Sequence, residues 1–157
     1  MPQVLLRTAT PHDSAELLAL WALVYDEDGL APEQSWRPHA AEWFARAVGD
    51  PQSARFPVIE AGGAVVATAI GTLELGVPNP HCLRGRTVRL ANVITRPGHR
   101  RRGHGARLVA DVLGWARSIG TDRVDLSATP DGRRLYEKLG FVVTSAPRMK
   151  LVLGPDG

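Results

Sequence analysis

Cysteine, lysine and long apolar runs are scarce in this sequence of 157 residues. The single cysteine, Cys82, cannot form an internal disulfide, so nothing in the sequence requires an oxidising compartment. No uninterrupted apolar run approaches the roughly 18 residues that a membrane span needs. Residues 1–4 lack the basic stretch and apolar core of a signal peptide. We therefore expect a cytoplasmic protein that does not enter a membrane.

The composition is that of an ordinary globular protein, with 44% hydrophobic and 22% charged residues. This balance argues against a mostly disordered chain, and the length predicts a single domain over residues 1–157. Only Lys138 and Lys150 are lysines among the 19 basic residues, an arginine bias typical of a GC-rich bacterial genome. The 16 acidic residues leave a net charge of only +3.

The distribution of charge says more than its total. Residues 96–107 contain five arginines and two histidines but no acid. A basic cluster on a nearly balanced chain indicates an anionic ligand at one place rather than a protein that is basic throughout.

Hydrophobic periodicity and turn residues predict alternating strands and helices. Helices are expected to begin near Asp13 and near Gly105, and to cover residues 38–48 and 131–139. An acidic loop is expected at 26–29, after the first helix. The expected strands are 4–8, 56–61, 64–75, 88–95 and 124–128, with a final antiparallel pair at 141–143 and 149–153. A central hairpin with helices around it indicates a mixed α/β sheet, not a doubly wound parallel one.

Segment 93–108 combines the end of a strand, a basic loop with glycines and the start of a helix. Free N–H groups and the positive dipole end of a helix form a site for phosphate. Gly103 and Gly105 allow an anion to approach the backbone closely. A Walker motif is absent, and the third glycine of a dinucleotide fingerprint is missing. The alternative is a solvated arginine-rich loop that binds nothing.

Two motifs resemble those of the GNAT superfamily of N-acetyltransferases. Arg100-x-x-Gly103-x-Gly105 after a strand resembles the family's acetyl-CoA loop, Q/R-x-x-G-x-G/A. The segment Leu135-Tyr-Glu-Lys-Leu-Gly-Phe141, which begins 30 residues beyond Gly105, resembles the family's helix-to-strand segment. The resemblance covers nearly the whole chain. It implies a mostly antiparallel twisted sheet of about seven strands, splayed at the cofactor cleft and flanked by about four helices.

The resemblance also implies an acetyl-CoA-dependent enzyme that acetylates a primary amine of a small molecule or peptide by direct attack in a ternary complex. Backbone groups of Val93 and Thr95 are implied to pair with the pantetheine arm, and Thr129 to contact coenzyme A. Ile94 and Arg100 are implied to belong to the same cofactor site. The pyrophosphate is implied to be held by the N–H groups of Arg101, Arg102, Gly103, His104, Gly105 and Ala106.

For catalysis, the resemblance puts Tyr136 at the general-acid position, where a phenol of pKa about 10 protonates the departing thiolate. The alternative is a tyrosine that only packs in the core. Many relatives have a glutamate on the strand before the loop, whereas this strand offers Asn92, which positions a water but is not a base. Glu74 and His81 are candidate substitutes, and the alternative for His81 is a loop histidine without a role. A strand N–H near Val93 stabilises the developing oxyanion.

The acceptor site is expected to be lined by Asp26, Glu27, Trp43 and His81, with Tyr25, Asp28 and Trp36 nearby. Three consecutive acids beside aromatic rings suit a cationic amine. The alternative is an ordinary solvated loop.

The sequence also bears on other possible functions. A non-catalytic acyl-CoA-binding module with the same fold stays an alternative. Nucleic-acid binding is not expected, because the basic loop has no interleaved aromatic residue and the net charge is low. A metal site is not expected, because His99 and His104 have no cysteine or acid nearby. A homodimer is left open.

Overall fold

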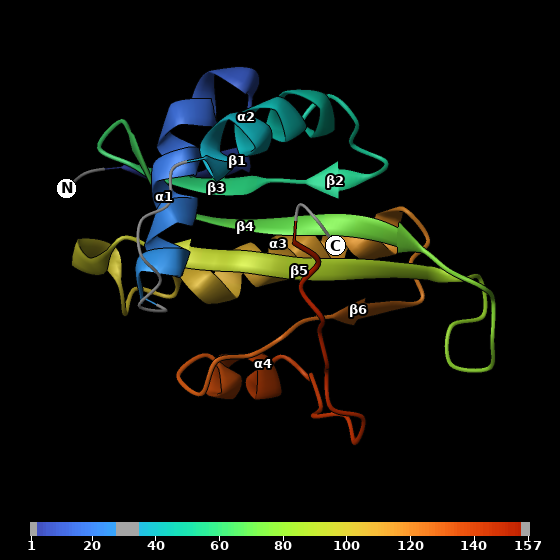
Figure 1. The fold of residues 1–157 in the computed structure, drawn as a ribbon. Coiled ribbons are helices and arrows are strands. Elements are labelled where there is room, and N and C mark those ends of the chain that lie inside the picture. Colours follow the sequence, from blue (N-terminus) through green and yellow to red (C-terminus); the bar gives the residue numbers. More distant parts are fainter. Residues whose placement is uncertain (1–2, 28–34, 155–157) are drawn as a thin grey trace. The chain divides into compact units, whose positions relative to one another are not determined.

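Figure 1 shows a computed structural model of the protein, which describes residues 3–27 and 35–154. The chain divides into two compact units, Met1–Ser127 and Ala128–Gly157, called here the N-terminal unit and the C-terminal unit. The expectation of one domain over the whole chain stays a prediction. Nearly all regular structure among the described residues belongs to the N-terminal unit.

A six-stranded sheet forms the N-terminal unit, in the order β1-β3-β4-β5-β6 with β2 paired to β4. All pairs are antiparallel except β5 with β6, which is parallel. Gly62 and Gly63, with φ of 59° and 81°, form the predicted two-residue turn between β3 and β4. The strands are β1 Val4–Thr8, β2 Ala54–Arg55, β3 Pro57–Ala61, β4 Ala64–Leu75, β5 Arg86–Thr95 and β6 Arg123–Asp125.

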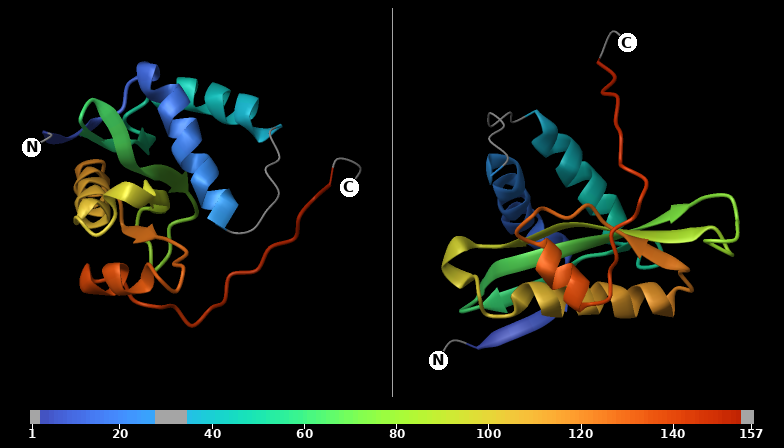
Figure 2. Two further views of the ribbon diagram at one scale, coloured as in Figure 1. Left: turned by 90° about the vertical axis from the view of Figure 1, so that its left-hand side faces the viewer. Right: turned by 90° about the horizontal axis from the view of Figure 1, so that it is seen from below.

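Helices cover both faces of this sheet. Helices α1 and α2 pack on one face, and α3 packs on the other (Figure 2). The mixed α/β class expected from the sequence is confirmed. The helices are α1 Ser14–Glu27, α2 Trp36–Ala47, α3 His104–Ser118 and α4 Arg133–Lys138, with short 3-10 turns η1 Pro11–Asp13 and η2 Pro97–His99.

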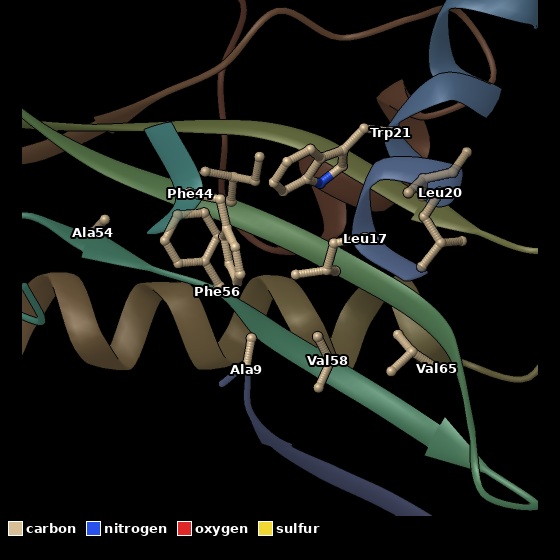
Figure 3. Packing of buried hydrophobic residues seen from close by; sticks show 11 residues of the cluster. Ala9, Leu17, Leu20, Trp21, Phe44, Ala54, Phe56, Val58 and Val65 are labelled. Carbon is tan, nitrogen blue, oxygen red and sulfur yellow. The ribbon is translucent and has the colours of Figure 1, made fainter. Parts of the chain in front are cut away.

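The main core lies between the sheet and helices α1 and α2 (Figure 3). Phe56 is at its centre, with ring centroids 5.0 Å from Phe44 and 5.4 Å from Trp43. Leu17 and Leu20 on α1 are fully buried against the same cluster. The apolar face of α1 predicted from its helical spacing therefore faces the sheet.

On the opposite face, α3 approaches β4 so closely that a side chain at Gly71 would not fit. A Cβ at Gly71 would lie 2.8 Å from Val112 and 3.1 Å from the ring of Trp115. The indole N–H of Trp115 donates a hydrogen bond of 2.7 Å to the carbonyl of Pro51. These contacts fix the position of α3, and with it the loop that precedes α3.

The start of α1 is tied to β1 through Asp13. The buried Asp13 carboxylate accepts two hydrogen bonds from Arg7, of 2.8 and 2.9 Å, and one of 2.7 Å from the Thr10 N–H. The hydrogen bonds from Arg7 outweigh desolvation and hold the pKa of Asp13 below its ordinary value.

Helix α1 is longer than expected. The acidic loop predicted at 26–29 begins inside the helix, because Asp26 and Glu27 are its last two residues. Acidic residues do not break a helix as glycine or proline does, so the triplet was a poor signal for its end. Asp28 lies outside the described residues.

The C-terminal unit contains α4 and little other regular structure. The predicted strands 141–143 and 149–153 are wrong for the described residues, where both segments have no strand assignment. Among the described residues neither segment pairs with the other or with a strand of the sheet, so neither has the hydrogen-bonding neighbour that a strand needs. The β-prone side chains of these segments are exposed instead, with Leu151 at 84% and Val142 at 84%.

Candidate active site

Strand β5 has the edge strand β6 as its neighbour over only part of its length. Their parallel pairing covers only Thr87 to Arg89 on β5 and ends where Arg89 is opposite Asp125. On its other side β5 stays paired with β4 as far as Thr95. The backbone of β5 beyond Arg89 therefore has a strand neighbour on one side only, among the residues that the structure describes.

A β-bulge interrupts β5 within this one-sided stretch. Thr68 is opposite Ile94 and Ile70 is opposite Ala91, so Asn92 and Val93 face a single residue of β4. Asn92 has a φ of 49°, a left-handed conformation that asparagine tolerates better than most residues. The bulge thus turns the half-buried Asn92 and Val93 out of the regular ladder.

The backbone of Thr95 faces the side that β6 has left. The N–H of the next residue, Arg96, donates a hydrogen bond of 2.8 Å to Val66 of β4. Because successive backbone groups of a strand point to opposite edges, the groups of Thr95 point away from β4. The guanidinium of Arg100 donates a hydrogen bond of 3.1 Å to the Thr95 carbonyl, which agrees with this orientation.

The chain then passes through η2 and an exposed basic loop to the start of α3. Arg101 and Gly103 have left-handed φ values of 63° and 79°. A Cβ at Gly103 would meet nothing within 4 Å, so the space beside this glycine is open. The tight loop therefore depends on glycine for its backbone conformation rather than for a close contact within the protein.

The N-terminus of α3 has the features of an anion site. It has no side-chain cap hydrogen bond and no acid in its first turn. Its first N–H groups lack intrahelical partners, and the helix dipole is positive there. Gly105 and Ala106 are half-buried in this first turn, while the three arginines 100–102 are exposed before it.

His104, the first residue of α3, is buried, with 5% of its surface exposed. Neither of its ring nitrogens has a hydrogen-bond partner. Burial lowers the pKa of His104, and the nearby charges of Arg107 and Arg102 and the ring of His99 lower it further. The imidazole is therefore neutral at neutral pH, and it packs beneath the loop rather than adding to its charge.

The predicted acceptor residues occupy different places. The ring of Trp43 packs in the core, 6.1 Å from Trp21 and 5.4 Å from Phe56. Asp26 and Glu27 end α1. The residue before them in the sequence, Tyr25, has its ring edge to face with that of Trp36, with centroids 5.6 Å apart.

His81 lies near the other end of β5. It is exposed in the loop between β4 and β5, and its N–H donates a hydrogen bond of 2.9 Å to Asn79. Glu74 is paired with Thr87 near the same end. Six residues of strand separate Arg86 from Asn92, or about 20 Å. The structure thus does not bring His81 or Glu74 together with the bulge.

Asp122 holds this distant loop in place, a role that the sequence reading missed. Its carboxylate accepts hydrogen bonds of 2.8 Å from the Arg84 N–H and 2.9 Å from the Arg84 guanidinium. Desolvation raises the pKa of Asp122, but these bonds and that of 3.2 Å from the Arg86 N–H outweigh it and lower the pKa to about 2. No short motif marks this clamp, because its partners are 36 and 38 residues away.

Two predicted residues belong to the C-terminal unit. Tyr136 is half-buried on α4, with its ring 5.9 Å from that of Phe141 in an edge-on contact. Burial raises the pKa of Tyr136, which keeps the phenol protonated. Thr129 accepts a hydrogen bond of 3.2 Å from the Gly132 N–H and so helps to start α4.

A strand edge without a neighbour can pair with an extended ligand, and an uncapped helix start can bind phosphate. Together they suit an extended cofactor that carries phosphate. The family model described as Acetyltransferase (GNAT) family matches residues 17–141. This chain therefore belongs to the GNAT acetyltransferase family, and the family and enzyme class expected from the sequence are confirmed.

Solved structures agree in fold. A predicted acetyltransferase from Clostridium acetobutylicum, solved with acetyl-CoA, is 20% identical, with 96% of each chain covered and a TM-score of 0.86. A GCN5-related N-acetyltransferase from Ralstonia eutropha is 21% identical, with 95% of this chain and 99% of that one covered and a TM-score of 0.84. Glucosamine-6-phosphate N-acetyltransferase from Arabidopsis thaliana is 17% identical, with 95% and 98% covered and a TM-score of 0.77.

Acetyl-CoA is the cofactor of this family, so the expected cofactor is confirmed at the level of the family. Among curated proteins, none matches the chain. Within residues 3–27 and 35–154, no helix has the length and apolar character needed to cross a membrane.

Proposed function

We propose that this protein transfers the acetyl group of acetyl-CoA to a primary amine of a small molecule or peptide. The amine attacks the thioester directly while both substrates are bound. The observation that carries the proposal is the one-sided stretch of β5 that leads, through an acid-free basic loop, to the uncapped start of α3. An extended chain that ends in phosphates fits this sequence of features.

In this proposal the backbone of β5 binds the pantetheine arm. The arm pairs with Val93, Ile94 and Thr95, where β5 has no contact with β6. An arm that contains amides can pair with a strand edge as another strand does. The N–H groups at the start of α3 bind the pyrophosphate. The loop residues of this site are Arg100, Arg101, Arg102, Gly103, His104, Gly105 and Ala106. The geometry supports them as one site because they are consecutive and enclose no acid.

Acetyl-CoA supplies an activated acetyl thioester when it is bound. A backbone N–H at the bulge near Val93 stabilises negative charge on the carbonyl oxygen. Asn92 orients a water that takes up the proton of the amine, because β5 carries no carboxylate. Tyr136 donates its phenolic proton to the departing sulfur, and its raised pKa suits a donor that must stay protonated until that step.

For the acceptor we propose a cationic amine that meets Asp26 and Glu27 beside the rings of Tyr25 and Trp36. The support is their position in the chain, since both acids follow Tyr25 directly at the end of α1. Arg37 already lies 5.5 Å from the centroid of Trp36, so the ring face accepts a cation. Trp43 packs against the core, so its contribution to the acceptor site is to hold α2 in place. His81 lies at the other end of β5, away from the acids.

A non-catalytic acyl-CoA-binding module is the second candidate. The absence of any acid on β5, Arg86–Thr95, favours it, because no strand residue acts as a base. Binding of acetyl-CoA without turnover on any amine would identify such a module.

The test is thioester turnover followed as free thiol, with acetyl-CoA and a panel of polyamines, aminoglycosides, amino acids and peptides. We expect thiol release that depends on one class of amine, together with calorimetric binding of acetyl-CoA and competition by desulfo-CoA. Binding without release supports the module. Absence of both contradicts the proposal.

A cytoplasmic location and Thr129 as a contact for coenzyme A belong to the same proposal. Cys82 is free and buried, so the fold needs no oxidising compartment.

A further inference from the structure

Arg89 lies at the point on β5 where the strand loses its neighbour β6. It is the last residue of β5 that pairs with β6, and the bulge at Asn92 follows after about 10 Å of strand. The side chain of Arg89 is half-buried. The proposed acetyl transfer makes no use of this guanidinium, although it is close to the bulge.

The side chain of Arg89 lies on the face of the sheet that α1 and α2 cover. Leu90 is opposite Gly71, where a Cβ would meet side chains of α3, so Leu90 faces α3. Arg89 is adjacent to Leu90 and therefore faces the other way. Ala91 agrees, because it is opposite Ile70, a member of the core cluster beneath α1 and α2. Arg89 thus shares a face with α1, whose last residues are proposed to meet the acceptor.

No carboxylate within residues 3–27 and 35–154 forms an ion pair with Arg89. Its guanidinium donates a hydrogen bond of 2.9 Å to the hydroxyl of Ser127. Asp125 is directly opposite on β6, but its carboxylate pairs with Arg123 at 3.5 Å. The positive charge of Arg89 is therefore balanced by no acid in the described part of the chain.

Other half-buried arginines of the N-terminal unit have partners that explain them. Arg7 and Arg55 each donate two hydrogen bonds, of 2.8 and 2.9 Å, to the carboxylate of an aspartate. Arg86 and Arg96 donate to backbone carbonyls of other elements, at 2.9 and 3.2 Å, and so tie those elements together. Arg89 has neither kind of partner.

A guanidinium that is partly removed from water loses hydration, and an anion that accepts two of its hydrogen bonds compensates best. The planar fork of arginine matches the oxygens of a carboxylate or a phosphate. Since the described chain supplies no such group to Arg89, a ligand that brings one to this face of the sheet fits the site.

We propose that the acceptor is a primary amine that also carries a carboxylate or a phosphate, and that Arg89 binds this anionic group. The inference rests on the proposed function and names its substrate class. The bulge near Val93 is where that function places the reacting carbonyl, three residues along the strand from the pair of Arg89 with Asp125. A chain of several atoms therefore separates the amine of the acceptor from its anionic group.

The first test compares amines of similar length that differ in charge. Thiol release from acetyl-CoA is measured with ε-aminocaproate, with aminopentyl phosphate and with the neutral control ε-aminocaproamide. We expect kcat/KM of the wild type to be about 10- to 100-fold higher for at least one of the two anionic amines than for the amide. The amine that gains distinguishes a carboxylate site from a phosphate site. Equal values for all three overturn the proposal.

Two variants locate the preference. Arg89→Gln should lower kcat/KM for the preferred anionic amine to the value for the amide. The matched control Arg117→Gln removes the same charge from an exposed position on α3, on the other face of the sheet, and should retain the preference. All four tryptophans lie in the N-terminal unit, so their fluorescence verifies that both variants are folded. A preference that survives in Arg89→Gln overturns the proposal.

The second test needs no turnover. The Nε–H signal of Arg89 in the ¹⁵N-labelled protein is assigned by its absence from the spectrum of Arg89→Lys. With coenzyme A bound, this signal should shift on addition of the acetylated form of one of the two anionic amines, and should not shift with acetylated ε-aminocaproamide. Thiol release with no amine at all contradicts the proposed function. Absence of the Arg89 shift with both anionic compounds overturns the role of Arg89.

Discussion

The two units of this chain differ in what stabilises them. The N-terminal unit contains every buried residue that the structure describes, including Leu17 and Phe44 at the centre of its core. In the C-terminal unit, described to residue 154, no residue is buried and the one helix has six residues. The N-terminal unit therefore carries the stability of the fold, while the C-terminal unit supplies a proposed catalytic group. Each of the following changes should affect one unit and spare the other.

The largest expected effect is on chemistry and comes from the C-terminal unit. Tyr136→Phe removes only a hydroxyl, so kcat should fall about 100-fold through loss of the general acid. Affinity for coenzyme A and the melting temperature should not change, because the core and the proposed phosphate loop lie in the other unit. Thr144→Val, which removes an exposed hydroxyl from the same unit, is the control. Steady-state kinetics that show full kcat for Tyr136→Phe would make this tyrosine a packing residue.

Next comes cofactor binding in the N-terminal unit. Gly103→Val places a side chain in the open space beside the loop and strains a backbone with a φ of 79°. Calorimetry should show coenzyme A binding weakened about 10- to 100-fold, or about 1.4–2.8 kcal/mol. The control is Gly114→Val, on an exposed part of α3 where a Cβ also meets nothing within 4 Å. Equal affinities for the two variants would refute the assignment of the loop.

A smaller effect separates stability from activity. Asp13→Asn weakens the two hydrogen bonds from Arg7 and should lower the free energy of unfolding by about 1–3 kcal/mol. In contrast Glu42→Gln breaks an exposed pair with Arg46 and should cost less than about 0.5 kcal/mol. Urea titrations measure both. Turnover per folded molecule should be the same for the two variants.

The ion pair of Arg7 and Asp13 also predicts that the free energy of unfolding falls at acid pH. Because Arg7 lowers the pKa of Asp13 in the folded state, the folded protein binds fewer protons than the unfolded chain. The stabilisation is complete above the unfolded pKa of about 3.9 and is lost as the pH falls through the lower folded value. The difference in free energy of unfolding between wild type and Asp13→Asn should therefore shrink in this pH range. A constant difference down to pH 2 would contradict the assigned charge state.

The smallest effect concerns His104. Its lowered pKa means that the unfolded chain takes up a proton first, so stability should decrease as the pH falls below about 6.5. The decrease ends below the folded pKa. His104→Leu should flatten this slope, while His81→Gln in the exposed loop should leave it in place. Thermal melts between pH 5 and 7.5 compare the three proteins.

The sequence predicted the main elements of the N-terminal unit well because they are long. Strand β4, the Gly62-Gly63 turn and α3 follow from β-prone composition, turn residues and helical spacing. The segments 141–143 and 149–153 have the same local signals but no neighbour to pair with. Local propensity cannot show whether a partner strand exists.

In the candidate site too, local features can be predicted from the sequence and long-range ones cannot. The glycines and arginines of the proposed phosphate loop lie in one continuous segment, so the sequence alone is enough to propose them as a site. The bulge at Asn92 depends on its register with β4, and the partial burial of Trp43 depends on its contacts with Phe56 and Trp21. His81 lies at the other end of β5 from the bulge, and its position in the sequence does not reveal this separation. Such placements arise from long-range pairing.

The most direct measurement is a titration of the ¹⁵N-labelled protein with coenzyme A, followed by backbone amide shifts. The amides of Gly103, Gly105 and Ala106 at the start of α3, and of Val93 and Thr95 on β5, should shift the most and saturate together. The amide of His81, at the other end of β5, should not move. Binding that leaves the start of α3 and the β5 edge unchanged, or no binding, would contradict the proposed cofactor site.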